Sequence, residues 1–211
     1  MKKWITLLLA LSLILAFSAC GQSSPEPTAE STAPESTEAA VEKRSDDAKI
    51  LVAYFSRTGN TRPLAEHAAE LLDADLYEIQ AADPYTDADI NYGDSDSRTS
   101  KEQNDPDARP AIAGSVESME QYDIVVLAYP IWWGQAPRII STFIESYDFS
   151  GKTIIPFCTS GSSDIGSSAE NLQALCSDTA VWVEGKRFPA GAIEEMEDWL
   201  KDIPELDELF A

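Results

Sequence analysis

A chain of 211 residues has room for one ordinary domain with appendages and is too short for two enzymes of usual size. Its composition, 44% hydrophobic with five Trp, is that of a globular protein rather than a disordered or collagen-like one. The formal net charge of −22 argues against nucleic acid as a partner and favours positively charged redox or protein partners.

Residues 1–19 have the pattern of a signal peptide. Two lysines precede an apolar run over residues 5–17, which is short for a membrane span, and small residues precede Cys20. A cysteine in this place resembles the lipobox of bacterial lipoproteins, although Phe17 stands where Leu is usual. We therefore expect a lipidated Cys20 and a bacterial lipoprotein at the outer, extracytoplasmic face of the cell membrane, held by the lipid anchor only. An ordinary cleaved leader with a chance cysteine is the alternative.

Residues 20–48 predict a disordered tether. From Gly21 onward the segment consists mainly of Ser, Pro, Glu, Thr and Ala, with Val41 as its only large aliphatic side chain and no aromatic residue. Such a composition cannot bury enough apolar surface to form a core. The folded domain is expected over residues 49–211.

Strand-like and helix-like segments alternate along residues 49–211. Continuous apolar runs predict buried parallel strands at 50–55, 124–128, 153–157 and 181–183, and a more polar run at 76–80 predicts an edge strand. Helical spacing is found at 62–72, 137–146, 168–176 and 192–201. The alternation predicts an α/β fold, a three-layer, doubly wound, five-stranded parallel sheet. Ligands of such folds bind beyond the carboxyl ends of the strands, where the winding direction reverses.

The first of three unusual loops follows the first strand. It reads Ser56-Arg57-Thr58-Gly59-Asn60-Thr61. Free backbone N–H groups at a helix start, one glycine and several hydroxyls are suited to binding an anion. No lysine is present, so a phosphate monoester fits better than a nucleoside triphosphate. A plain strand-to-helix turn with Thr61 as helix cap is the alternative.

This loop resembles the phosphate loop of the flavodoxin family, Thr/Ser-x-Thr-Gly-x-Thr, at Ser56, Thr58, Gly59 and Thr61. The resemblance extends over residues 49–211 and is closest to bacterial flavodoxin-like proteins that carry Tyr-Phe-Ser-Arg-Thr-Gly-Asn-Thr. It implies the strand order 2-1-3-4-5 and a non-covalently bound flavin mononucleotide (FMN), whose phosphate this loop wraps.

The second loop follows the strand at 124–128 and contains two adjacent tryptophans. Its candidate binding residues are Pro130, Ile131, Trp132, Trp133 and Gly134. Two exposed indoles are unusual unless a planar aromatic ligand covers them. The resemblance implies that the loop lies along the isoalloxazine ring of FMN, without saying which indole stacks. Tryptophans packed under neighbouring helices are the alternative.

The third loop, after the strand at 153–157, is rich in Ser and Gly. It resembles a Thr-Ser-Gly-x-Ser-x-Ile-Gly loop that holds the other side of the flavin ring, which gives the candidates Thr159, Ser160, Gly161, Ser162, Asp164 and Ile165. A flexible loop capped by Ser167 is the alternative. Because all three loops follow sheet strands at the same edge, we expect them to converge.

The remaining features are less specific. Residues 82–120 form an insertion that short-chain flavodoxins lack, with two open roles: covering the flavin or docking a partner. Cys158 and Cys176 are expected to be two free, buried thiols, and His67 a solvated side chain. Without clustered His and Cys, no metal site is expected, and without a partner for His67 no catalytic residue is expected.

The resemblance to the flavodoxin family implies an electron-transfer flavoprotein. FMN supplies the redox chemistry, and the protein supplies orientation and electrostatics toward an unknown redox protein partner. A flavin-dependent NAD(P)H or quinone oxidoreductase is the alternative, because similar loops serve both. A flavin-free binding module is a third possibility, against which the intact phosphate loop argues.

Overall fold

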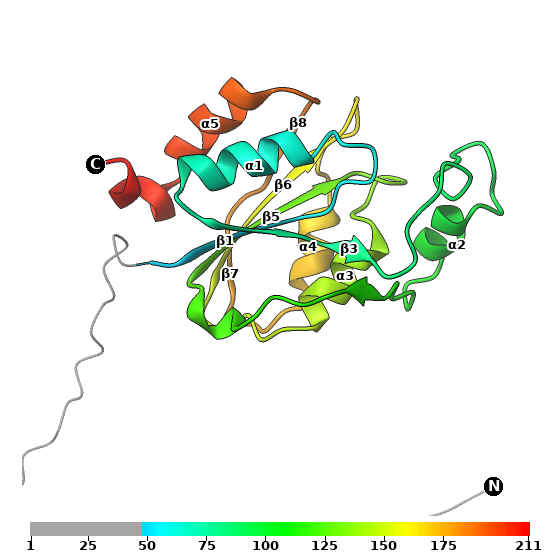
Figure 1. The fold of residues 1–211 in the computed structure, drawn as a ribbon, viewed down its shortest axis with the longest axis horizontal. Coiled ribbons are helices and arrows are strands. Elements are labelled where there is room, and N and C mark those ends of the chain that lie inside the picture. The colour runs from blue at the N-terminus through cyan, green and yellow to red at the C-terminus, as the bar shows by residue number, and fades with distance from the viewer. Residues whose placement is uncertain (1–47) are drawn as a thin grey trace, which may run out of the picture. The chain divides into compact units, whose positions relative to one another are not determined.

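The structure, a computed structural model, describes residues 48–211. The predicted leader, Cys20 and the tether up to residue 47 lie outside the described residues. The described chain contains a parallel sheet in the order β2-β1-β5-β6-β7, with β8 also paired to β6 (Figure 1). The strands are β1 Ile50–Tyr54, β2 Asp75–Glu78, β5 Ile124–Pro130, β6 Thr153–Thr159, β7 Val181–Trp182 and β8 Lys186–Phe188.

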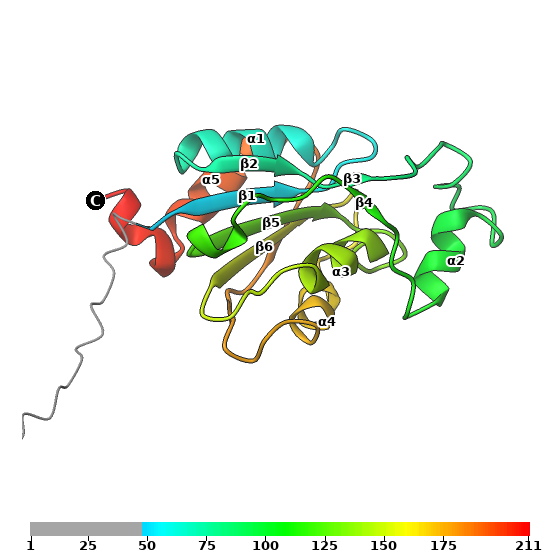
Figure 2. The ribbon, with the colours of Figure 1, turned by 60° about the horizontal axis from the view of Figure 1, so that its bottom comes forward.

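Helices cover both faces of the sheet. Alternate side chains of β1 face opposite sides, so that Val52 packs against one pair of helices and Leu51 lies in the core under the other pair. Helices α1 and α5 cover the first face, and α3 and α4 cover the second (Figures 1 and 2). Their bounds are α1 Arg62–Leu71, α3 Arg138–Glu145, α4 Ser168–Gln173 and α5 Ile193–Lys201, with short 3-10 turns at Met119–Gln121 and Pro204–Leu209.

The predicted fold class is confirmed, including the parallel order 2-1-3-4-5 when the strands of the main sheet are numbered along the chain. The fifth strand differs from the expectation, because two short strands share its place. β7 pairs with Thr153 and Ile154, and β8 pairs with β6 from Phe157 onward. The break falls beside Pro156, which has no N–H to donate to a neighbouring strand.

The insertion leaves and returns beside the main sheet. Strand β3 (Gln80–Ala81) pairs antiparallel with β4 (Ile112–Ala113), which closes the base of the excursion. Between them lies helix α2 (Arg98–Asn104), apart from the four helices that cover the sheet (Figures 1 and 2). Part of the insertion therefore has secondary structure of its own, namely β3, α2 and β4.

The expectation of a solvated His67 is met only in part. Its side chain is only 31% exposed, and Nε2 lies 2.8 Å from Glu197 Oε2. The reason is that α1 packs beside α5. The pattern of residues within α1 alone does not show this contact.

Both thiols are free, as predicted, but only Cys158 is fully buried. Burial raises the pKa of Cys158 to about 12 and the pKa of the partly buried Cys176 to about 11.

Among residues 48–211, no helix is long and apolar enough to cross a membrane.

Candidate functional site

The three loops identified in the sequence meet at the carboxyl ends of β1, β5 and β6. Between them lie two adjoining hollows of about 330 Å³ each. The hollows share four lining residues and form one groove, which we call the loop groove. It is lined by Thr58, Asn60, Ile90, Tyr92, Pro130, Ile131, Trp132, Trp133, Gly134, Thr159, Ser160, Gly161, Ser162, Ser163 and Ala190.

One end of the loop groove is formed by the turn between β1 and α1. Ser56 Oγ accepts the backbone N–H groups of Thr61 and Arg62, each at 3.2 Å, and so satisfies the first donors of the helix. The backbone N–H groups of residues 58–60 have no acceptor within residues 48–211, and these residues are exposed. Gly59 has a φ of +82°, a left-handed conformation that costs glycine little. The turn therefore presents uncommitted donors, which suit an anion.

Two residues of this turn, Arg57 and Thr61, make contacts with other segments of the chain. Thr61 is buried beneath the groove, and its Oγ1 lies 2.8 Å from Thr159 Oγ1. The Arg57 guanidinium turns toward the insertion, where Nε donates to the Tyr85 carbonyl and a terminal N–H donates to Asp87 Oδ1 at 2.6 Å. Thr58 is thus the exposed hydroxyl of the turn, whereas Arg57 and Thr61 hold neighbouring segments in place.

The loop after β5 reverses in a tight turn. Trp132 and Gln135 exchange both backbone hydrogen bonds, at 2.8 and 2.9 Å, and the two residues between them, Trp133 and Gly134, have φ values of +51° and +77°. A positive φ is costly for tryptophan, and such strain is concentrated at functional sites.

The two tryptophans of this loop have different surroundings. Trp132 is 5% exposed and packs edge-on against Phe55 and Tyr85. Trp132 is thus packed, but against Phe55 after β1 and Tyr85 of the insertion rather than under a helix. Trp133 is partly exposed and lines the loop groove, with its ring edge-on to Tyr92.

The loop after β6 is held by the neighbouring strand β8. Arg187 donates to the Ser160 carbonyl from Nε and a terminal nitrogen, at 3.1 and 2.6 Å, and to the Gly161 carbonyl at 2.8 Å. Ser160 N–H donates to the Phe188 carbonyl at 3.1 Å. These contacts keep the polar backbone of residues 159–161 at the edge of the groove.

The lining of the loop groove is uncharged. It includes hydroxyls, an amide and aromatic rings but no Asp, Glu, Lys or Arg. Among residues 48–211, no group of three or more His, Cys, Asp or Glu side chains could hold a metal ion. The groove is therefore suited to a ligand that brings its own reactive group.

Comparison with known proteins identifies the family. The profile described as Flavodoxin matches residues 49–203. The chain belongs to the flavodoxin family. A candidate flavoprotein from Bacteroides eggerthii DSM 20697 is 46% identical, with a TM-score of 0.69 over 74% of this chain and 98% of that one. No curated protein matches the chain.

Two further solved structures are similar to this flavodoxin-family chain. A candidate flavoprotein from Bacteroides uniformis ATCC 8492 is 45% identical, with a TM-score of 0.69 over 73% of this chain and 98% of that one. A flavoprotein from Lactobacillus acidophilus NCFM, solved in complex with FMN, is 24% identical, with a TM-score of 0.55 over 72% of this chain and 98% of that one. The Lactobacillus acidophilus protein shares the fold of this chain.

Most of the candidates from the sequence come together in this flavodoxin-family domain. Six of them do not line the loop groove: Ser56, Arg57, Gly59, Thr61, Asp164 and Ile165. Ser56 and Arg57 line a hollow beside the end of β2, and Ile165 lines one beside β7. Sequence reasoning gave no site role to five residues that the structure brings to the groove or its support: Ile90, Tyr92, Ser163, Arg187 and Ala190. The signals among them were an aromatic residue inside an unexplained insertion and a further serine in the third loop.

Proposed function

We propose that this chain binds FMN in the loop groove and transfers electrons to and from a protein partner while a lipid on Cys20 anchors it at the outer face of a bacterial membrane. The observation that carries the proposal is the pairing, within one uncharged groove, of uncommitted backbone donors at residues 58–60 with the aromatic ring of Trp133.

The donor set fits a phosphate group. Residues 58–60 offer three backbone N–H groups, and Thr58 adds an exposed hydroxyl near the start of α1, where the helix dipole favours negative charge. A Cβ added at Gly59 would meet nothing within 4 Å, so the space in front of the turn is open.

The other walls fit a planar ring with polar edges. Ile131 and Trp133 provide apolar and aromatic surface, and residues 159–161 add small polar side chains and a glycine to the lining. When bound there, FMN would supply the one- and two-electron redox chemistry. This chain's own residues bind and orient the ring and exclude water from one side of it.

The relatives support the same ligand. The Lactobacillus acidophilus protein was solved with FMN, and the two Bacteroides proteins are described as candidate flavoproteins. The groove lining offers no carboxylate, histidine or lysine as a proton donor or acceptor, and an electron carrier needs none.

Titration of the purified protein with FMN, followed by quenching of flavin fluorescence, tests the proposal. We expect one-to-one binding that weakens about tenfold or more in Thr58→Ala, because a hydrogen bond to a charged group contributes about 1.5–3 kcal/mol. Binding of riboflavin, which lacks the phosphate, should not change. Thr179→Ala, at an exposed threonine outside the groove, is the matched control. Failure of the wild-type protein to bind FMN would contradict the proposal.

Two further assays separate the remaining parts of the proposal. Steady-state oxidation of NAD(P)H with a quinone acceptor should be negligible; rapid turnover would establish the reductase alternative instead. Membrane fractionation should find the wild-type chain with the membranes, whereas Cys20→Ala should release it. An unchanged distribution of Cys20→Ala would overturn the lipid anchor.

A further inference from the structure

Two tyrosines of the insertion contact the two tryptophans of the loop after β5. Tyr85 meets Trp132 edge-on, with ring centroids 5.2 Å apart at 81°. Tyr92 meets Trp133 edge-on, with centroids 4.1 Å apart at 75°. The insertion therefore touches the loop groove through aromatic side chains at two places.

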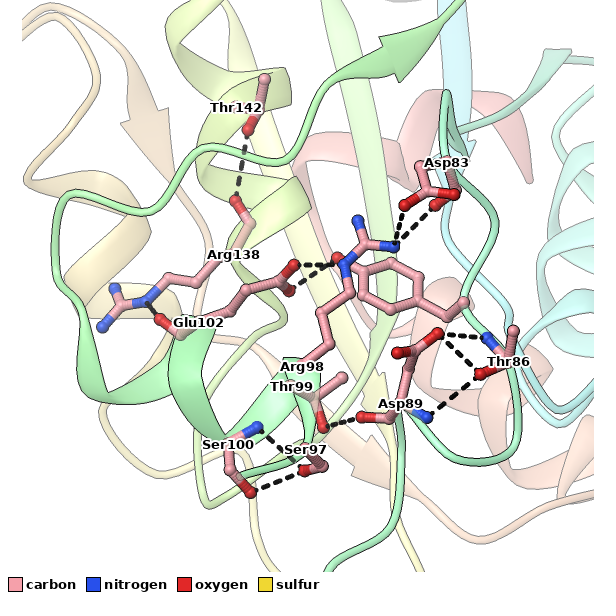
Figure 3. A network of polar contacts seen from close by, with 11 residues as sticks. Asp83, Thr86, Asp89, Ser97, Arg98, Thr99, Ser100, Glu102, Arg138 and Thr142 are labelled. Atoms are coloured by element: carbon pink, nitrogen blue, oxygen red, sulfur yellow. Dashed lines mark hydrogen bonds and ion pairs between the residues drawn. The ribbon is translucent and has the colours of Figure 1, made fainter. Parts of the chain in front are cut away.

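Tyr85 has a structural role that is complete within the protein. Its ring is 5% exposed, and its hydroxyl donates to Glu102 Oε2 at 2.8 Å. The Arg98 guanidinium lies over the ring, 4.0 Å from its centroid. Arg98 also pairs with Glu102 (Figure 3). Tyr85 thus fastens the start of the insertion to α2.

Tyr92 differs from Tyr85 because its own contacts leave it uncovered. It is 59% exposed, and its hydroxyl has no hydrogen-bond partner within residues 48–211. It lines both hollows of the loop groove, beside Ile131, Ser160 and Gly161. A large, exposed aromatic side chain that lines a groove can cover one side of a planar ligand bound there.

The segment that carries Tyr92 is fixed at both ends by α2. Thr99 donates to the Asp89 carbonyl from its backbone N–H at 3.0 Å and from Oγ1 at 2.7 Å (Figure 3). Ser100 Oγ donates to the Asp94 carbonyl at 2.8 Å. The position of Tyr92 is therefore set by hydrogen bonds on either side of it.

Helix α2 is in turn fixed to the site. Arg138, at the start of α3, donates to the carbonyls of Glu102 and Gln103 at 3.2 and 3.1 Å, of which the contact to Glu102 appears in Figure 3. Gln103 Nε2 donates to the Ala136 carbonyl, in the loop after β5, at 3.1 Å. One continuous set of contacts thus leads from this loop through α2 to Tyr92 and back to Trp133.

We propose that Tyr92 forms the outer wall of the loop groove beside Trp133, where the flavin ring would lie. The insertion would then determine how tightly the flavin ring is held and how far water reaches it. The inference rests on the proposed binding of FMN. It gives the insertion the role of cover and names the residue that acts.

Flavin titration of Tyr92 variants tests this inference. We expect Tyr92→Ala to weaken binding of FMN and of riboflavin alike, by about tenfold, because the lost contact is to the ring and not to the phosphate. The visible absorption band of the bound flavin should lose vibronic structure as water reaches the ring. Tyr92→Phe keeps the ring and should behave as wild type. Leu76→Ala, which shortens an exposed side chain on β2, is the matched control.

The outcomes separate this inference from the proposed function. If the wild-type protein binds neither flavin, both proposals fail. If it binds FMN and Tyr92→Ala binds both flavins as tightly, with the same absorption band, Tyr92 is not a wall and only this inference fails. Loss of FMN binding with riboflavin binding unchanged would also overturn it, because that pattern belongs to the phosphate end.

A second variant tests the position of Tyr92 without touching the ring. Thr99→Val removes the Oγ1 contact to the Asp89 carbonyl and keeps the side-chain shape. Hydrogen exchange of residues 89–94 should become faster, and flavin affinity should fall part of the way toward that of Tyr92→Ala. Faster exchange with unchanged affinity for both flavins would show that the held position of Tyr92 is irrelevant to binding.

Discussion

The hydroxyl oxygens of Thr61 and Thr159 lie 2.8 Å apart beneath the loop groove, and both side chains are buried. Thr61 precedes α1 and Thr159 ends β6, so the contact joins two loops that are 98 residues apart in the chain. Because β5 lies between β1 and β6, this bond spans the groove floor across the central strand.

Removing one of these hydroxyls should destabilise the fold. We expect Thr61→Val to lower the free energy of unfolding by about 1–3 kcal/mol, because it leaves a buried hydroxyl without its partner. Thr61→Val with Thr159→Val should cost less than the sum of the two single changes, since the double variant leaves no such orphan. Urea denaturation of the four proteins measures this cycle; strict additivity would contradict the bond.

Arg187 should control the order of the loop after β6. Arg187→Met keeps the apolar stem and removes the donors to the carbonyls of Ser160 and Gly161. We expect faster hydrogen exchange over residues 159–165 and weaker FMN binding. Lys186→Met, next to it on β8, is the control, since Lys186 contacts Glu195 instead. Equal exchange in the two variants would refute the role of Arg187.

The pair Arg109–Glu145 ties the insertion to α3 and should make stability sensitive to acid. Hydrogen bonding to Arg109 holds the pKa of Glu145 below its ordinary value of 4.5. A lowered pKa stabilises the folded state above pH 4.5, and this contribution is lost as the pH falls through the folded-state value. Glu145→Gln should therefore reduce stability at pH 7 and lose less of it on acidification than wild type. Urea unfolding at several pH values measures the difference; parallel curves would contradict it.

The two thiols should differ in reactivity. Burial raises the pKa of Cys158 to about 12 and of Cys176 to about 11, so little thiolate is present at pH 8. We expect slow maleimide labelling of the folded protein, with Cys176 reacting before Cys158 because only Cys158 is fully buried. Mass spectrometry of Cys158→Ala and Cys176→Ala assigns each site. Faster labelling at Cys158 would show that β6 opens locally.

Much of the fold could be read from local patterns. The run 50–55 identified a strand buried on both faces, and the spacing in 62–72 identified the helix after it. The boundaries were less predictable: the strand expected at 181–183 ends as β7 at Trp182, and a second short strand, β8, follows at 186–188, because Pro156 on the neighbouring strand interrupts the pairing. That cause lies on another strand and leaves no trace in the segment itself.

The candidate site was predictable where function requires particular backbone chemistry. Glycine, hydroxyls and a helix start in residues 56–61 marked a donor-rich turn at a known edge of the sheet. The individual roles were not predictable, because Thr58 and Thr61 look alike in sequence. Only the fold exposes Thr58 and buries Thr61 against Thr159.

The sequence alone determined the class of the domain, its flavodoxin relationship and the three loops, because hydrophobic periodicity and backbone chemistry are local properties. The tertiary structure decided which tryptophan fills the core, how Arg187 holds a loop and where the insertion places Tyr92. These outcomes depend on contacts between residues far apart in the chain, such as Tyr92 and Trp133. Such contacts are selected by the packing of the whole domain, and no local pattern records them.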